Sequence, residues 1–191
     1  LDGQVNVVQL REKDLPANEL LTLAQELREL TAGRALFFVN DRVDVALAAG
    51  ADGVQLGEYA LPVEAVRELG GDRLLVGRSV HDIAGAVAAE ASGADFLIAG
   101  TVFPSSSHPR REAAGVDLLE DLKTALEIPY LAIGGITSYN VAQAIDAGAS
   151  GAAVISAISE SGEVEAATRQ LTAAVDSAWR LAKTDLAGRT T

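Results

Sequence analysis

The sequence predicts an α/β fold of the closed (β/α)8 type, a TIM barrel, and three observations support this prediction. A phrase of small residues, glycine, and aspartate or serine recurs at 48–54, 91–96 and 146–152. Each copy follows a helical pattern and precedes a short apolar run, so each is a junction that leads from a helix into a strand. Apolar runs and amphipathic stretches alternate along the chain, which is typical of βαβ units with parallel strands.

The short apolar runs are the predicted strands. They lack the regular polar and apolar alternation of a sheet with one wet face, and they suit parallel strands that are buried on both sides. Seven of them can be counted, at 5–10, 36–39, 53–56, 74–76, 96–99, 130–133 and 152–155.

The amphipathic stretches between the strands are the predicted helices, at 18–30, 41–48, 63–69, 83–91, 118–126, 139–147 and 164–182. Seven compact units favour the barrel over an open doubly wound sheet, because flavodoxin-like sheets usually hold about five strands. An eighth unit is needed to close a barrel. We expect its strand and helix to lie upstream of Leu1, with residues 1–3 as the end of that helix. We expect one barrel domain over 1–182 and a frayed tail over 183–191.

Composition limits the classes of partner. The 191 residues include 15 Lys and Arg against 27 Asp and Glu, for a net charge of −12, which argues against nucleic acids and anionic membranes as partners. The absence of cysteine excludes disulfides, thiolate metal sites and cysteine nucleophiles. We find no membrane span and no signal segment, and these features fit a cytoplasmic protein. A homodimer stays open as an assembly.

Candidate functional residues lie just after the apolar runs, because the sites of β/α barrels lie at the carboxyl ends of the strands. Gln9, Arg11 and Lys13 follow the first run. A guanidinium fork and an ammonium point charge together suit a diphosphate. The alternative is a surface cluster in which these cations pair with Glu12 and Asp14.

Gly134 and Gly135 end the sixth run, and Ser156 follows the seventh. Without side chains, the backbone amides of such a turn can reach an anion, and in barrels these two strand ends commonly form a phosphate cup. The alternative is a tight turn with no ligand.

Asn40 and Asp41 follow the second run. Carboxylate and amide oxygens suit Mg²⁺, which usually keeps several waters. The same residues before Val43 are also typical of a helix N-cap, and both interpretations stay open.

The two histidines are His81, just after Ser79, and His108, in a loop rich in serine, proline and arginine. His108 is a candidate acid, base or anion contact near neutral pH. A solvated or packed imidazole is the alternative for each.

Five motifs together resemble the superfamily of thiamin phosphate synthase and TenI. They are VVQLREKDL at 7–15, FVNDRVDVALAAGADGVQLG at 38–57, GRSVH at 77–81, GADFLIAGTVFPSSSHP at 93–109 and LAIGGIT at 131–137. The resemblance runs from about residue 5 to residue 158. It implies a β/α barrel that begins with one strand and helix before the segment matching Leu1.

The resemblance implies a synthase that couples an aminopyrimidine diphosphate to a phosphorylated thiazole carboxylate, with loss of pyrophosphate and carbon dioxide. It assigns the diphosphate to Gln9, Arg11, Lys13 and Asn40, Mg²⁺ to Asp41, and the pyrimidine to Ser79. It assigns the binding of the thiazole phosphate to Gly134, Gly135, Ile155 and Ser156. Lys13, Ser79 and His108 are the expected catalytic residues.

Two positions depart from the synthase pattern. A second Mg²⁺ aspartate is usual where this chain has Ala60, and a lysine is usual where it has His108. The resemblance to TenI implies a tautomerase acting on the same thiazole phosphate, although the usual TenI histidine is replaced by Thr101, which we expect to contact the substrate. A tautomerase would therefore use His108, and a non-catalytic thiazole phosphate carrier is a third alternative.

Overall fold

The computed structural model describes residues 1–105 and 112–188, with the side chains of the last helix described through residue 182. These residues form two compact units. Unit 1 comprises Leu1, Val5–Ser79 and Ala88–Leu97, and unit 2 comprises Asp2–Gln4, Val80–Val87 and Ile98–Thr191. The expectation of a single domain over 1–182 stays a prediction.

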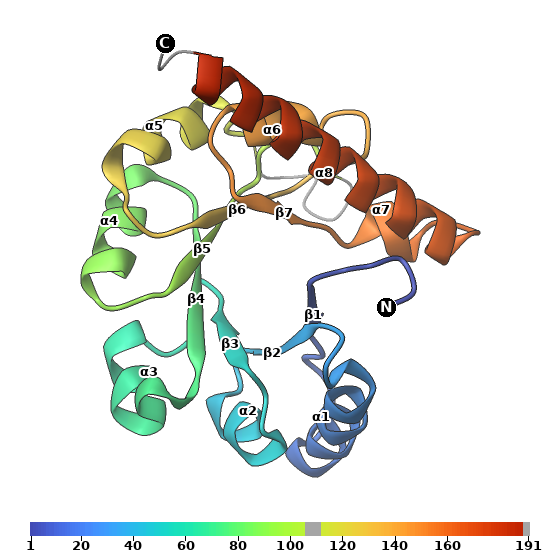
Figure 1. Ribbon diagram of the computed structural model, residues 1–191. Coiled ribbons are helices and arrows are strands. Elements are labelled where there is room, and N and C mark those ends of the chain that lie inside the picture. The colour runs from blue at the N-terminus through green and yellow to red at the C-terminus, as the bar shows by residue number, and fades with distance from the viewer. Residues whose placement is uncertain (106–111, 189–191) are drawn as a thin grey trace. The chain divides into compact units, whose positions relative to one another are not determined.

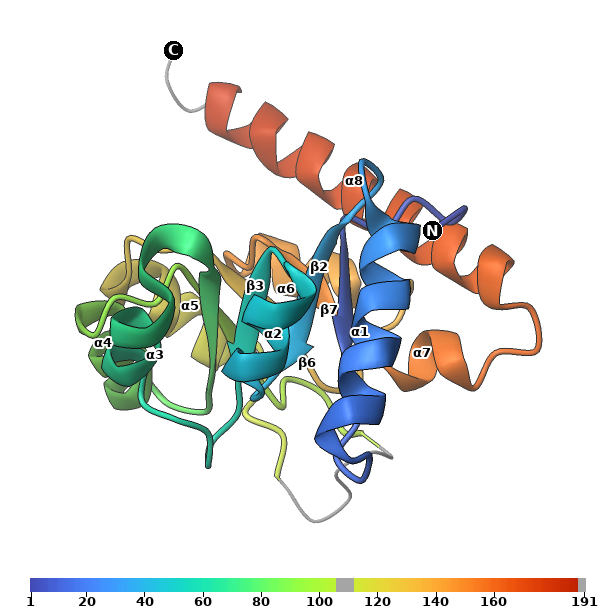
Figure 2. The ribbon, with the colours of Figure 1, turned by 90° about the horizontal axis from the view of Figure 1, so that it is seen from below.

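Unit 1 is a parallel sheet with a helix after each of its first three strands. The strands lie side by side in chain order, with register pairs such as Phe38↔Gly53 and Gln55↔Gly77. Helices α1 and α2 run alongside strands β1 to β3 (Figures 1 and 2). The elements are β1 (Val7–Leu10), α1 (Ala17–Thr31), β2 (Leu36–Asn40), α2 (Val43–Ala49), β3 (Gly53–Leu56), α3 (Val63–Gly70), η1 (Gly71–Arg73) and β4 (Leu75–Val80).

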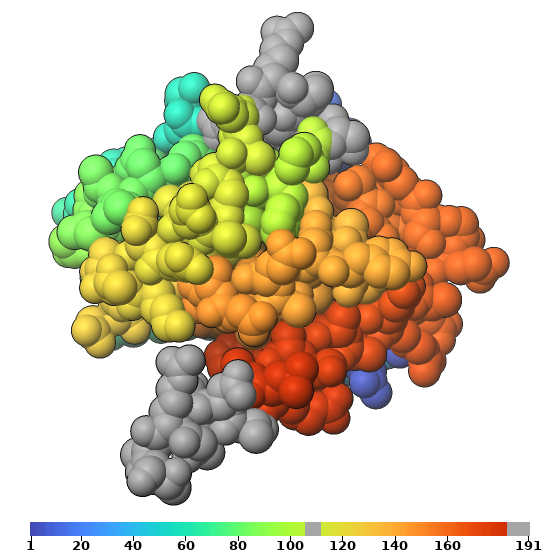
Figure 3. Space-filling view, turned by 90° about the horizontal axis from the view of Figure 1, so that it is seen from above, coloured from blue at the N-terminus to red at the C-terminus, as the bar shows by residue number. Residues whose placement is uncertain are grey.

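Unit 2 continues the same alternation. Strands β6 and β7 pair in parallel, with Leu131 opposite Gly151. Helix α8 packs along α6, and the two surfaces adjoin in Figure 3, where α8 is red and α6 is orange. The elements are α4 (Ile83–Ala91, whose last turn belongs to unit 1), β5 (Phe96–Gly100), α5 (Asp117–Ala125), β6 (Tyr130–Ile133), α6 (Val141–Asp146), β7 (Gly151–Ala153), α7 (Ser156–Ser159) and α8 (Val164–Gly188).

All seven predicted strands and all seven predicted helices are present, with shifted ends. The fourth strand extends to Val80, so Ser79 lies within it rather than after it. The last helix continues to Gly188, which corrects its predicted end at 182, because a helix packed over its first turns needs no apolar stripe in its last ones. Residues 1–3 form a turn instead of a helical end.

The junction phrases have a physical explanation in unit 1. Asp52 Oδ2 accepts the N–H of Phe37, at 2.8 Å, and pairs with Arg28 Nη1 at 2.6 Å. The carboxylate thus holds the start of the neighbouring strand and the end of the preceding helix together. The negative charge of Asp52 is thus neutralised by Arg28 at the amino ends of the strands.

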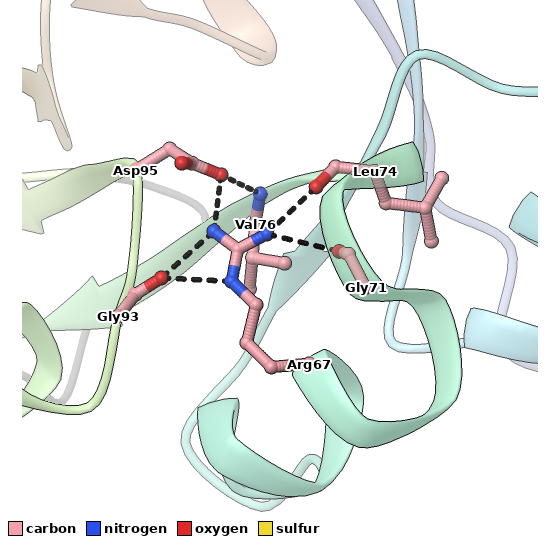
Figure 4. A network of polar contacts seen from close by, with 6 residues as sticks. All are labelled: Arg67, Gly71, Leu74, Val76, Gly93 and Asp95. Atoms are coloured by element: carbon pink, nitrogen blue, oxygen red, sulfur yellow. Dashed lines mark hydrogen bonds and ion pairs between the residues drawn. The ribbon is translucent and has the colours of Figure 1, made fainter.

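Asp95, in the second phrase, makes the same pair of contacts. Its Oδ2 accepts the N–H of Val76 at 2.6 Å and pairs with Arg67 Nη2 at 2.5 Å. The Arg67 guanidinium also donates to the carbonyls of Gly93 and Leu74 (Figure 4). One arginine therefore connects α3, the end of α4 and the first residues of β4.

The third phrase, in unit 2, has Ser150 where the others have aspartate. The Ser150 N–H donates to the carbonyl of Tyr130, and the Ser150 carbonyl accepts the indole N–H of Trp179 at 3.2 Å. Helix α8 therefore contacts this junction through a neutral N–H, whereas an arginine forms an ion pair at each junction in unit 1. Within the described residues, no helix is long and apolar enough to cross a membrane.

Candidate functional site

A row of polar side chains occupies one face of the unit 1 sheet near the carboxyl ends of its strands. Asn40 is in register with Gln55, and Gln55 with Gly77, two residues before Ser79. The side chains of Asn40, Gln55 and Ser79 therefore leave the sheet on the same side. Gln9 Nε2 donates to Asn40 Oδ1 at 3.0 Å, and Gln55 Nε2 donates to Ser79 Oγ at 3.1 Å. The structure therefore brings together three predicted residues, Gln9, Asn40 and Ser79.

The two predicted cations follow Gln9 on the same strand end. The side chains of Arg11 and Lys13 are exposed, and within the described residues neither forms an ion pair or a hydrogen bond. Glu12 Oε1 instead accepts the backbone N–H groups of Lys13 and Asp14, at 2.8 and 3.1 Å. The alternative of a surface ion-pair cluster is therefore wrong, and both cations keep their capacity for an anion.

Asn40 and Asp41 do not cap the second helix, which corrects that alternative. The residue before α2 is Arg42, and no side chain caps the helix. Asp41, with φ of 59°, directs its carboxylate to the next strand end, where Oδ1 accepts the Gly57 N–H at 2.7 Å. Arg42 pairs with Asp44, and their hydrogen bond lowers the pKa of Asp44. The Arg42 charge is thus already balanced.

The donors around Asp41 suit Mg²⁺ bound through a single carboxylate. Oδ2 of Asp41 makes no hydrogen bond within the described residues, and Asp41 is half-buried. Among those residues no cluster of three His, Cys, Asp or Glu side chains could hold a metal. Ala60 lies in the β3–α3 loop, which Arg78 holds by donating to the carbonyls of Glu58 and Leu61. Mg²⁺ often binds one or two carboxylates together with substrate phosphates and water, so Asp41 alone is compatible with it.

Gly134 and Gly135 form a turn that only glycine fits. Their φ angles are 96° and 62°. A Cβ on Gly134 would lie 2.4 Å from the Thr101 methyl, and a Cβ on Gly135 would lie 2.4 Å from the Pro104 carbonyl oxygen. Both the backbone conformation and the close approach of the preceding loop therefore exclude a side chain.

In this turn the carbonyl oxygens accept hydrogen bonds, whereas two of the backbone N–H groups have no partner among the described residues. Gly134 O accepts the Phe103 N–H at 3.0 Å, and Gly135 O accepts Asn140 Nδ2 at 2.9 Å. In a trans peptide the following N–H points opposite to the carbonyl, so the N–H groups of Gly135 and Ile136 point away from these partners. Neither amide has a hydrogen-bond partner in the part of the chain that the structure describes.

The same turn lines a small cavity of unit 2. It is lined by residues 133–136 and 153–157 together with Ser105. Ile155 is 50% exposed, and Ser156 is the first residue of α7, so the Ser156 N–H has no acceptor within its helix. The structure therefore brings Gly134, Gly135, Ile155 and Ser156 together, as the sequence predicts.

The remaining predicted residues are Thr101, His81 and His108. Thr101 is 8% exposed, and its methyl packs against Gly134, so it shapes the glycine turn. His81 is exposed, and its Nδ1 contacts the Gly100 carbonyl. His108 lies outside the described residues.

Sequence reasoning gave no role to Gln55. Its amide is 3% exposed and is the partner of Ser79. A polar residue within an apolar strand, one register step from a glycine, is the signal that could have identified it.

The fold and the site define a class of protein. Parallel β/α units carry their uncommitted polar groups at the carboxyl ends of the strands, so the chain is an α/β protein of the TIM-barrel-like class. Residues 1–158 match the family model described as thiamine monophosphate synthase. The chain belongs to this family of enzymes.

Relatives agree with the family model. The chain is 51% identical over 160 residues to a putative thiamine-phosphate synthase of Geobacter sulfurreducens, covering 83% of this chain and 75% of that protein. It is 47% identical over 171 residues to the thiamine-phosphate synthase of Methanoculleus marisnigri, covering 88% and 81%. The solved thiamine phosphate pyrophosphorylase of Pyrococcus furiosus superposes with a TM-score of 0.86 at 40% identity, covering 93% of this chain and 86% of that one.

Proposed function

We propose that the protein is a thiamin phosphate synthase that couples an aminopyrimidine diphosphate to a thiazole phosphate carboxylate. The observation that carries the proposal is the pair of uncommitted cations, Arg11 and Lys13, in a chain with a net charge of −12. Cations at this position suit a reaction that releases a highly charged leaving group, because they stabilise the charge that develops on it. A tautomerase moves one proton and has no such need.

In the proposed reaction, the C–O bond between the pyrimidine methylene and the diphosphate breaks, and pyrophosphate leaves with the bonding electrons. The thiazole nitrogen donates its lone pair to the methylene carbon, and the carboxylate then leaves as carbon dioxide while a proton takes its place. Arg11 and Lys13 stabilise the charge that develops on pyrophosphate, which lowers the barrier to ionisation. Gln9 and Asn40 orient each other through their hydrogen bond and position the diphosphate.

Asp41 would hold Mg²⁺ through Oδ2, and the metal when bound supplies further positive charge to the diphosphate oxygens. Asp41 Oδ1 stays committed to the Gly57 N–H, which fixes the direction of the carboxylate. In unit 2, the N–H groups of Gly135, Ile136 and Ser156 would bind the phosphate of the thiazole substrate, because uncharged backbone amides can donate hydrogen bonds to an anion.

One assay tests the proposal against its alternatives. The purified protein is incubated with Mg²⁺, the aminopyrimidine diphosphate and the thiazole phosphate carboxylate, and thiamin phosphate is measured. A parallel reaction without the pyrimidine measures the tautomerisation of the thiazole. Thiamin phosphate formation that needs Mg²⁺ supports the synthase. Proton exchange without coupling would indicate a TenI-type tautomerase, and tight binding with neither activity would indicate a carrier.

A further inference from the structure

Gln55 carries a buried polar atom without a partner. Its side chain lies within β3, 3% exposed, and its Oε1 has no hydrogen-bond partner in the described part of the chain. Leaving such a group buried and unpaired is unfavourable, because nothing compensates for the loss of its bond to water. A residue retained at that cost needs a compensating role.

The orientation of the Gln55 amide follows from its neighbours. Nε2 lies 3.1 Å from Ser79 Oγ and 3.4 Å from the Leu56 carbonyl oxygen. A flipped amide would place Oε1 against the Leu56 carbonyl, and two acceptors would then repel each other. The amide therefore donates to Ser79, and the Ser79 oxygen accepts.

Because Ser79 Oγ accepts the hydrogen bond from Gln55, the Ser79 hydroxyl proton remains available for another group. A hydroxyl has one proton to donate in addition to its lone pairs, and Ser79 donates to no other group within the described residues. Ser79 is half-buried, so its proton can face a ligand. A hydroxyl that accepts a hydrogen bond from behind is polarised into a better donor.

The neighbouring strand makes room for this arrangement. A Cβ on Gly77 would lie 2.2 Å from Gln55 Oε1 and 2.3 Å from Phe96 Cζ. The glutamine pose therefore depends on a missing side chain on β4. The arrangement therefore involves three residues on two adjacent strands, namely Gln55 on β3 and Gly77 and Ser79 on β4.

We infer that Gln55 is a positioning residue that turns the Ser79 hydroxyl proton toward a ring nitrogen of the pyrimidine substrate. The inference rests on the proposed function and on the family resemblance, which implies that Ser79 contacts the pyrimidine. Gln55 itself does not touch the substrate, because its amide oxygen is buried. It acts through Ser79 and selects rings that present an acceptor nitrogen at that point.

A double-mutant cycle tests the inference with Gln55→Met, Ser79→Ala and the combined variant. Methionine keeps the length of the side chain and removes both the donor and the orphaned oxygen. We expect Gln55→Met to lower kcat/KM for the pyrimidine diphosphate about 10-fold, the worth of one hydrogen bond, with KM for the thiazole phosphate unchanged. In the Ser79→Ala background it should change nothing further. The melting temperature of Gln55→Met should equal or exceed that of the unmutated protein.

Val54→Ala is the matched control, because it removes buried volume from the same strand without touching Ser79. It should lower the melting temperature and leave the kinetics unchanged. Wild-type kinetics in Gln55→Met, or an equal loss with and without Ser79, would overturn the inference. If the unmutated protein forms no thiamin phosphate, the proposed function fails instead. The same cycle measured by calorimetric binding of the aminopyrimidine diphosphate then decides the role of Gln55.

Discussion

The two ends of the unit 1 strands differ in how their charges are used. At the amino ends, Arg28 and Arg67 are paired with Asp52 and Asp95, and both carboxylates also hold backbone N–H groups. At the carboxyl ends, the exposed side chains of Arg11 and Lys13 have no partner among the described residues, and Gln55 Oε1 has none either. One end is satisfied and stabilises the sheet. The other leaves capacity for a ligand, as is general for β/α folds.

The largest expected effect comes from removing an uncommitted cation. Lys13→Ala should lower coupling by about 10³-fold, because one charge that stabilises the leaving group contributes on that scale. The unfolding free energy should not change, since the exposed Lys13 side chain makes no ion pair within the described residues. Steady-state kinetics and chemical denaturation measure the two effects. The matched control is Lys123→Ala, an exposed lysine of α5. An unchanged coupling rate in Lys13→Ala would refute its assigned role.

The reverse result is expected at the amino ends. Arg67→Ala removes the ion pair to Asp95 and the hydrogen bonds to Gly93 and Leu74. We expect the unfolding free energy to fall by about 3 kcal/mol, with kcat unchanged well below the melting temperature. Arg73→Ala is the control, because Arg73 caps two carbonyls without a carboxylate partner and should cost under about 1 kcal/mol. Equal costs for the two variants would contradict the prediction.

In unit 2 the candidate phosphate-binding groups are backbone N–H groups, which no side-chain truncation removes. A substitution that adds a side chain is therefore needed to disturb them. Gly135→Ala puts a Cβ into the Pro104 carbonyl and should weaken thiazole phosphate binding about 10²-fold, the worth of two hydrogen bonds to a charged group. Gly50→Ala is a matched control, because its φ of 65° is similar and the space around it is open. Calorimetric titration with the thiazole phosphate separates them. Comparable losses in both variants would mean that backbone strain, and not the amides, is responsible.

The smallest effect concerns the amino end of β6 and appears only at high pH. Tyr130 is buried and donates to the Leu119 carbonyl, and burial raises its pKa to about 12. The unfolded chain loses this proton near pH 10, so the stability is fully present below pH 10 and falls as pH rises toward 12, by about 2 kcal/mol. Tyr130→Phe should remove that slope in denaturation curves, and the exposed Tyr139→Phe should not. A persistent slope in Tyr130→Phe would exclude Tyr130 as its source.

The order of the elements could be predicted from the sequence, because apolar runs and glycine junctions are local signals. The residues at which the strands end were harder to predict. Strand β4 runs on to Val80 through Arg78 and Ser79, polar residues that lack an apolar signal, and Arg78 is in register with Leu56 of β3. The short α7 was missed because four residues carry no helical periodicity.

The placement of a candidate residue was predictable where residue type alone decides it, as for the exposed Lys13 and the turn at Gly135. It was not predictable where a neighbouring strand decides it. The sequence around Asp41 is also typical of a helix cap, and only the position of the Gly57 N–H shows where its carboxylate points. Gln55 gained its interpretation from the missing side chain of Gly77, one register step away on β4.

The single tryptophan of the chain has a practical consequence. Trp179 belongs to unit 2, and its indole reports on the contact between α8 and the residue that precedes β7. Fluorescence emission during heating is therefore an optical probe of that unit alone, whereas circular dichroism records the helices of both. Arg67→Ala should advance the dichroism transition ahead of the emission shift if the units melt independently, and should move the two traces together if they melt as one.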